Sequence, residues 1–145
     1  MNRTLTSIAV APSLVLQVPV LRAVLRIGAG GLFLQHGAQK LFGLLGGMGG
    51  SGASAELFSL MGLAGVLEFF GGLLIVLGLL TRPVAAVLML VMIAAYFMGH
   101  AGGGVLPIQN GGELAVLYAL IFAYITAAGP GAWSLGRRRA PEHSL

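Results

Sequence analysis

Apolar residues dominate four long stretches of the chain, and short runs rich in glycine and proline separate them. The stretches run from about Val20 to Leu45, from Leu57 to Leu80, from Pro83 to Gly99 and from Gly111 to Ala128. A helix that crosses the hydrocarbon of a membrane needs about 20 apolar residues, and roughly 17 to 25 are tolerated. The pattern therefore predicts an all-α membrane protein, a bundle of four transmembrane helices.

Turn-forming residues occupy the gaps between these stretches. Residues 46–54 read GGMGGSGAS, residues 81–83 read TRP, residues 102–107 read GGGVLP, and residues 129–131 read GPG. Glycine and proline at such density are typical of loops. We therefore expect one transmembrane domain over residues 20–135, in which short loops connect the four spans.

The segment from Leu5 to Leu21 is also apolar, but Pro12 and Pro19 interrupt it, and its Ser, Thr and Gln residues dilute it. Proline inside a helix removes a backbone hydrogen bond. We therefore expect residues 1–19 to form an interfacial or re-entrant arm. The alternatives are a fifth span or a signal peptide.

The arginines predict the orientation of the chain. All of them fall on one side of the predicted membrane: Arg3, Arg22, Arg26, Arg82 and Arg137 to Arg139. Because cytoplasmic loops carry the excess of Lys and Arg, we expect both termini in the cytoplasm, with residues 136–145 as a basic tail. Loops 46–56 and 100–112 then lie outside. We expect a multi-pass protein of the inner (cytoplasmic) membrane.

Composition excludes several classes of function. The 145 residues are 57% hydrophobic and 8% charged, whereas soluble domains have roughly 25% charged residues. Eight Lys and Arg against four Asp and Glu are too scattered for the continuous basic surface that binds nucleic acid. Without cysteine, the chain cannot form a disulfide, a thiolate nucleophile or an iron–sulfur cluster. Any redox chemistry must come from a bound cofactor or a partner.

Small residues predict how the helices pack. One set recurs every fourth residue in the last span: Ala115, Ala119, Ala123 and Ala127. Another set shares a helical face with Glu68: Ala64, Gly65, Gly71 and Gly72. Because small residues let helices approach closely in lipid, we expect both faces to lie in helix contacts. Glu68 then points into the bundle.

Glu68 is the most informative polar residue, because an ionised acid near the middle of a span costs at least about 2.5 kcal/mol. The first span carries His36, Gln39 and Lys40 on one face, the third ends at His100, and the fourth opens with NGGE. All of these lie in the outer half of the predicted membrane. We therefore expect one pocket for a ligand or a proton: His36, Gln39, Lys40, Glu68, His100, Asn110 and Glu113.

These residues also have simpler structural explanations. Asn110 and Glu113 have the spacing of a capping box at a helix start, and His100 can simply end its span in the headgroups. Lys40 and Glu68 can form a structural ion pair, and buried pairs are weak evidence of function. Two His and two Glu can bind metals, but no HxxxH or ExxH spacing arranges them on one helix. We therefore expect no metal site.

Several motifs resemble those of the DoxX family of small four-helix membrane proteins. In chain order they are Gln35-His-Gly-Ala-Gln-Lys-Leu-Phe-Gly43, Gly65-Val-Leu-Glu-Phe-Phe-Gly-Gly72, Gly78-Leu-Leu-Thr-Arg82, His100 at the end of its span, Asn110-Gly-Gly-Glu-Leu-Ala-Val-Leu-Tyr118 and Gly129-Pro-Gly-Ala-Trp-Ser-Leu135. The resemblance runs from about residue 20 to residue 135. Gly136 departs from it, because the family often has an acid there.

The resemblance implies a four-helix membrane fold and a set of family polar positions: His36, Gln39, Lys40, Glu68, Arg82, His100, Asn110 and Glu113. Family members are linked to archaeal quinol oxidation, to thiosulfate:quinone oxidoreduction and to oxidative-stress complexes. The family establishes no catalytic mechanism for any of these residues.

The function expected from residues and resemblance together is that of a redox-associated subunit in a membrane complex. Its pocket would handle a proton or the headgroup of a quinone, which would be bound and not covalently attached. One alternative is a purely structural accessory subunit, in which the polar cluster only locks the helices in register. The other is a small transporter or channel, in which Glu68 and two histidines bind an ion or substrate.

Overall fold

The computed structural model describes residues 12–136, with side chains from residue 17 onward, and this part of the chain is helical without strands. Its elements are α1 (Pro12–Phe42), α2 (Leu60–Leu77), α3 (Thr81–Gly99), the 3₁₀ helix η1 (Ala101–Gly103), the short α4 (Pro107–Asn110) and α5 (Glu113–Ala128).

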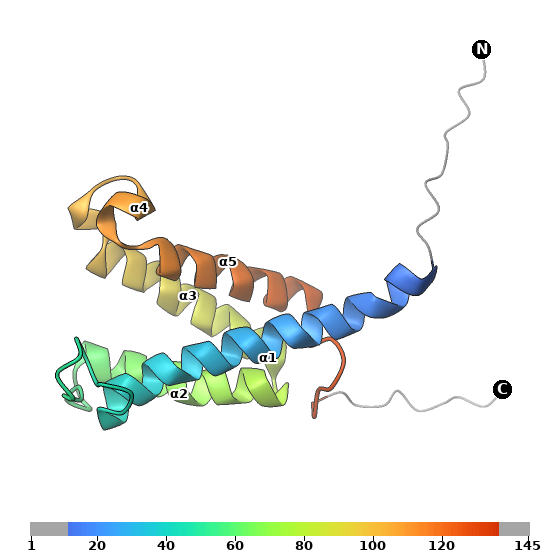
Figure 1. Cartoon of the computed structure of the whole chain (residues 1–145), viewed down its shortest axis with the longest axis horizontal. Helices are drawn as coiled ribbons and strands as arrows, with labels where there is room; N and C mark the ends of the chain where they lie inside the picture. Colours follow the sequence, from blue (N-terminus) through green and yellow to red (C-terminus); the bar gives the residue numbers. More distant parts are fainter. Residues whose placement is uncertain (1–11, 137–145) are drawn as a thin grey trace, which may run out of the picture.

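The four long helices form two pairs. α1 packs along α2, and α3 packs along α5; α2 also contacts α3, and α1 contacts α5 over a shorter stretch. The two pairs approach each other at one end and splay apart at the other (Figure 1). We call the splayed end, with residues 43–59 and 100–112, the Lys40 end. The opposite end, with residues 78–80 and 129–136, is the Arg26 end.

Glycines set the contact between α1 and α2. A Cβ atom at Gly37 would overlap the backbone of Phe69, and one at Gly72 would lie 2.8 Å from the backbone nitrogen of Leu34. Close approach of this kind requires small residues on helices that meet in lipid. The expected packing face of α2 is confirmed, because Gly65, Gly71, Gly72 and Glu68 are buried, with Ala64 half-buried beside them.

The aromatic side chains of α1 and α5 fill the middle of the bundle. Phe33 lies with its ring centroid 5.0 Å from that of Tyr118 and 4.9 Å from that of Phe122. Ile75 of α2 and Leu88 of α3 close this core and are almost fully buried. Burial of these large side chains holds the two helix pairs together.

The alanine ridge predicted for the last span does not form the buried face of α5. That face consists of Ala115, Tyr118, Phe122 and Ile125, which repeat at three- and four-residue intervals and bury far more apolar surface than alanines would. Ala127 is exposed. Ala115 belongs to both sets, and with Ala119 and Ala123 it lines an apolar groove between α5 and α3.

The helix boundaries lie within a few residues of the predicted spans, except at the start of α1. This helix begins at Pro12 and continues through Pro19, so residues 12–19 are helical and continuous with the first predicted span. Proline is favourable in the first turn, where its missing N–H has no helical partner. Pro19 removes one helical hydrogen bond, and its carbonyl accepts one from the backbone N–H of Ala132 at 2.8 Å. The rest of the expected arm, residues 1–11, and residues 137–145 of the expected tail lie outside the described residues.

Three helical segments are long and apolar enough to cross a membrane: Gln17–Phe42, Leu60–Leu77 and Thr81–Gly103. α5 is apolar but has 16 residues, about 24 Å of helix, against about 30 Å of hydrocarbon. It lies beside α3 (Figure 1). The described chain thus has three to four apolar helices, consistent with a membrane bundle.

Candidate functional site

The Lys40 end contains a buried ion pair between α1 and α2. The Lys40 Nζ donates to Glu68 Oε1 at 2.5 Å and to Oε2 at 2.6 Å. The Glu68 side chain is 2% exposed and that of Lys40 is 23% exposed. The predicted partnership of these two residues is therefore present. Glu68 has the opposite charge that an acid inside an apolar bundle requires.

Glycines make this pairing sterically accessible. Gly65 lies one helical turn before Glu68, and a Cβ atom there would come within 2.9 Å of the Lys40 Cβ. The absence of that atom lets the lysine stem cross the surface of α2 and present its ammonium group to the acid. The same close packing continues along α1 through Gly37. The ion pair is thus positioned by the helix contact.

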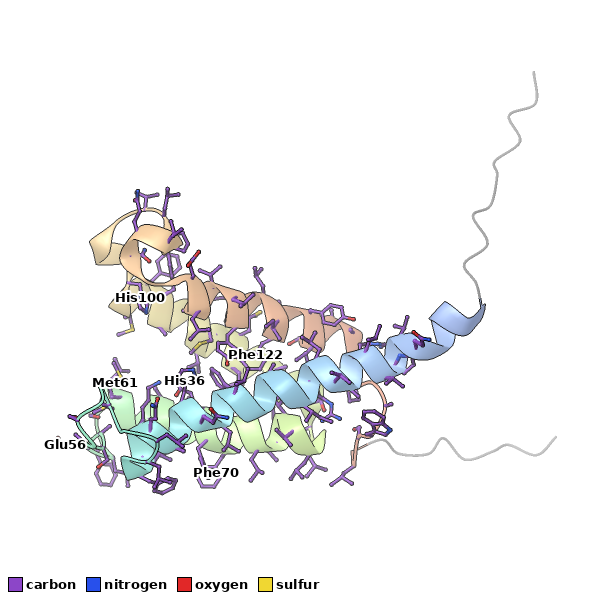
Figure 2. All side chains as sticks on the ribbon, viewed as in Figure 1. His36, Glu56, Met61, Phe70, His100 and Phe122 are labelled. Carbon is purple, nitrogen blue, oxygen red and sulfur yellow. The ribbon has the colours of Figure 1, made fainter. Side chains whose placement is uncertain are left out.

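His36 adds an imidazole on the same helix as Lys40. It lies one turn before Lys40, is half-buried, and meets the ring of Tyr118 edge-on, with 6.1 Å between centroids and 88° between planes. Figure 2 shows His36 on the side of α1 that faces the α3 and α5 pair. Tyr118 is 5% exposed. Three helices thus contribute to one polar cluster, made of His36, Lys40, Glu68 and Tyr118.

Tyr118 was not among the candidate residues predicted from the sequence. Its position between Ala115 and Phe122, at three- and four-residue spacing, placed a phenol on the buried face of α5. Buried tyrosine hydroxyls usually serve a polar neighbour. This spacing was the available signal, but the expected ridge of alanines implied a different face of the helix.

Gln39 and His100 do not join this cluster. The Gln39 side chain donates to the Leu45 carbonyl at 3.1 Å, in the loop that follows α1. His100 Nδ1 lies 3.2 Å from the Asn110 carbonyl. The Asn110 side chain donates to Tyr96 Oη at 3.2 Å and to the Gly104 carbonyl at 3.0 Å. These contacts close the connection between α3 and α5.

Glu113 is exposed at the first position of α5, and the capping-box explanation is wrong. The N-cap is Gly112, which makes no side-chain cap bond. The Asn110 Oδ1 instead accepts from the Gly112 N–H at 2.8 Å, two residues along the chain. This is a local turn in which asparagine bonds its own loop. Glu113 has no part in it.

The seven candidate residues therefore do not form one pocket in this structure. Among the residues described, no hydrogen bond links the polar cluster to His100, Asn110 or Glu113. The reason is the splay of the two helix pairs toward the Lys40 end (Figure 1). Lys40 and Glu68 belong to the α1 and α2 pair, whereas His100 and Glu113 belong to the α3 and α5 pair, so a similar depth in the membrane does not bring them together.

The arrangement at the Lys40 end suits a hydrogen-bonding ligand or a proton. Lys40 and His36 have N–H donors, and Glu68 has carboxylate acceptors. Within residues 17–136, no group of three or more His, Asp or Glu side chains is positioned to hold a metal ion. The donors and acceptors present therefore point to recognition of a carbonyl or to proton transfer.

The opposite end of the bundle contains a second buried polar site, which the sequence analysis missed. Arg26 has no exposed surface. Its guanidinium donates five hydrogen bonds to carbonyls: Nε to Pro130 at 2.9 Å, Nη1 to Ile75 at 2.5 Å and Val76 at 2.6 Å, and Nη2 to Ala132 at 3.3 Å and Trp133 at 2.9 Å. A cation here also stabilises the negative C-terminal end of α2. Arg26 thereby binds residues 129–136 onto the end of the bundle.

Neighbouring contacts strengthen this attachment. Arg22 donates to the Ala128 carbonyl at 2.7 Å, at the C-terminal end of α5. The Ser134 hydroxyl donates to the Gly78 carbonyl at 2.7 Å. Arg82, which is exposed, lies 3.4 Å from the Thr126 carbonyl. Arg22, Arg26 and Arg82, three of the arginines behind the predicted orientation, thus also bond carbonyls at the ends of helices.

Comparison with known proteins adds to this geometry. A sequence model described as DoxX matches residues 21–101, which include α2 and α3 and most of α1. A Haemophilus influenzae protein described as uncharacterized is 44% identical over 127 residues, which are 83% of this chain and 91% of the relative. No solved structure matches the chain. The family match contains Arg26, His36, Lys40 and Glu68, whereas Glu113 lies beyond it.

Proposed function

Because the chain belongs to the DoxX family of small membrane proteins, we propose that it is a redox-associated subunit of a membrane complex. In this proposal His36, Lys40 and Glu68 receive a quinone headgroup or a proton. The family and the apolar helices both indicate an integral membrane protein that contacts the lipid bilayer. The observation that carries the proposal is the ion pair between Lys40 and the buried Glu68.

The exposure of this pair is uneven, and that favours a ligand. Glu68 is almost completely covered, whereas part of the Lys40 side chain remains accessible. An ammonium group has three N–H donors, and two of them are used by the carboxylate oxygens. The third is free to donate to a ligand carbonyl from the accessible side.

The chain's own residues supply hydrogen bonds and a proton site. Lys40 and His36 donate toward the carbonyl oxygen of a quinone, and when Lys40 gives a proton to the reduced headgroup, the Glu68 carboxylate can take up the replacement proton. The sequence has no cysteine, so the electrons must come from a bound cofactor or a partner, and we propose a group bound by a partner subunit. The proposal therefore includes other proteins in the membrane complex.

We further propose that the Arg26 end faces the cytoplasm of a cell whose inner membrane contains the protein. Arg22 and Arg82 also lie at this end. Within the described residues, the Lys40 end has one Lys or Arg side chain, that of Lys40. Cations accumulate on the cytoplasmic side of membrane proteins. The polar cluster then opens toward the outer side.

Single introduced cysteines test this orientation, because the chain has none of its own. Ser54 and Leu135 are both exposed and lie at opposite ends. Ser54→Cys should react with an impermeant maleimide added outside intact cells. Leu135→Cys should react only after the membrane is opened. The reverse labelling pattern would contradict the orientation while leaving the fold intact.

Two variants test the proposed chemistry in a deletion strain complemented with the gene. Glu68→Gln keeps the shape and removes the proton site, so quinone-linked turnover should fall about a hundredfold. His36→Ala removes one hydrogen bond to the headgroup and should raise the dissociation constant of the quinone about tenfold.

Gln39→Met is the matched control, because Gln39 bonds only the Leu45 carbonyl in its own loop. It should retain full turnover. If Glu68→Gln and His36→Ala both reach the membrane at normal levels and support full turnover, the cluster is structural. The protein is then an accessory subunit, and the quinone proposal is wrong.

A further inference from the structure

One face of α1 is uncovered along its length. The side chains that α1 buries include Ala23, Arg26, Phe33 and Ala38. On the opposite side of the helix, at three- and four-residue spacing, lie Val24, Gly28, Gly31, Leu32 and Gln35. We call this second set the α1 outer face. It points away from α2 and α5, the two long helices that α1 contacts, and so toward lipid.

The glycines of this face have no role in the packing of the single chain. A Cβ atom at Gly28 or Gly31 would meet nothing within 4 Å, whereas one at Gly30 would lie 2.8 Å from the Ile75 side chain. Glycine destabilises a helix relative to alanine. Inside a helix it is therefore useful where another backbone must approach closely, and the described chain places no such backbone at Gly28 and Gly31.

Gln35 is an amide with no partner on the same face. It is exposed and makes no hydrogen bond within residues 17–136, in contrast to Gln39, which bonds Leu45. The depth of Gln35 in the membrane follows from its neighbour Gly37, two residues along α1. Gly37 packs against Phe69, at the middle of the 18-residue α2, so Gln35 also lies near the middle of the membrane. The hydrocarbon surface is then about 15 Å away. A glutamine side chain cannot reach water from there, and an unpaired amide in hydrocarbon is unfavourable.

We propose that the α1 outer face binds the same face of a second copy of this chain. An amide has both donors and acceptors, so two Gln35 side chains related by a two-fold axis satisfy each other. Copies inserted in the same orientation pack α1 parallel to α1, which brings equal residues together across the axis. Gly28 and Gly31 allow the close approach that such a pair needs.

This dimer does not depend on the proposed redox function. His36 borders the α1 outer face, one turn after Leu32, but its ring meets Tyr118 of α5, and Lys40 pairs with Glu68 on the α2 side. The polar cluster therefore stays open in the dimer. Negative results in the quinone experiments would not contradict the dimer, and a monomeric protein would not contradict the quinone proposal.

Cysteine cross-linking in native membranes tests the arrangement. Leu32→Cys lies on the α1 outer face, and Leu120→Cys on α5 is its control; the two leucines are 56% and 64% exposed. Under oxidation, Leu32→Cys should form a disulfide-linked dimer and Leu120→Cys should remain monomeric. Equal dimer yields, no dimer at Leu32, or cross-linking of Leu32→Cys to a different protein would overturn the proposal.

The strength of association tests the roles of the named residues. Gln35→Leu removes the amide and Gly28→Leu blocks close approach, and each should raise the dimer dissociation constant in liposomes about tenfold. Gly99→Leu is the control, because this glycine also has nothing within 4 Å but lies on α3. Thermal unfolding of each monomer checks that the fold persists. Unchanged dissociation constants, or a wild-type protein that is monomeric at every density, would contradict the dimer.

Discussion

Replacement of Arg26 by methionine is expected to lower the free energy of unfolding by about 3–5 kcal/mol. The wild-type guanidinium satisfies five carbonyls from two separate segments, the C-terminal end of α2 and residues 129–136. Methionine fills similar space but removes all five donors, and within the described part of the chain only the Ile75 carbonyl keeps another donor, the Gly78 N–H. The measurement is the unfolding of purified protein in one detergent, by heat or by titration with sodium dodecyl sulfate.

Two other variants separate this effect from a general loss of charge. Arg26→Lys keeps the charge but has fewer donors in a different geometry, so it should recover only part of the stability. Arg82→Met removes an exposed arginine whose one recorded contact is 3.4 Å long, and it should cost less than about 1 kcal/mol. If Arg26→Met is as stable as Arg82→Met, residues 129–136 are not held by Arg26 as described.

The second large effect is expected at the ion pair. Glu68 cannot reach water, whereas the Lys40 side chain is already partly exposed and its flexible stem can move. Lys40→Met strands the buried carboxylate or forces it to take up a proton, and should cost about 3–5 kcal/mol. Glu68→Gln should cost less, because the free ammonium can turn outward.

The double variant Lys40→Met with Glu68→Gln measures the coupling. Its loss of stability should fall short of the sum of the two single losses by about 1–3 kcal/mol. All four proteins are unfolded in the same detergent so that the cycle closes. Strict additivity would mean that the two residues do not interact, whatever their distance in the structure.

The sequence was sufficient to predict the helices and the ion pair, for physical reasons. Glycine and proline runs marked the loops, and apolar length marked the spans. Glu68 required a counter-charge inside the bundle, and Lys40 was the cation at the right depth. The extra turns at the start of α1 were not predictable, because Pro12 and Pro19 suggested an interruption and the helix continues through Pro19.

Arg26 shows why charge patterns can mislead. Near the end of an apolar stretch, an arginine looks like an orientation signal. Its spacing from Ala23, Ala29 and Phe33 placed it on the buried face of α1, and that signal was available. Its five carbonyl partners could not be predicted from the sequence, because they belong to residues 49 to 107 positions away. Only the folded chain brings their carbonyls together.

The expected seven-residue pocket was too broad for a similar reason. Depth in the membrane can be estimated from sequence, but lateral distance cannot. His100 and Asn110 are occupied by contacts within the connection between α3 and α5. The splay of the helix pairs then separates them from Glu68. The narrower cluster of His36, Lys40, Glu68 and Tyr118 depends on which helices are neighbours.

The most direct test of the proposed site is photolabelling of the wild-type protein in native membranes. The probe is a photoreactive short-chain ubiquinone, and labelled peptides are identified by mass spectrometry. We expect labelling of α1 near His36 and Lys40, or of α2 near Glu68, that excess ubiquinone prevents and Glu68→Gln weakens. Labelling confined to other segments, or labelling that excess ubiquinone does not reduce, would contradict it.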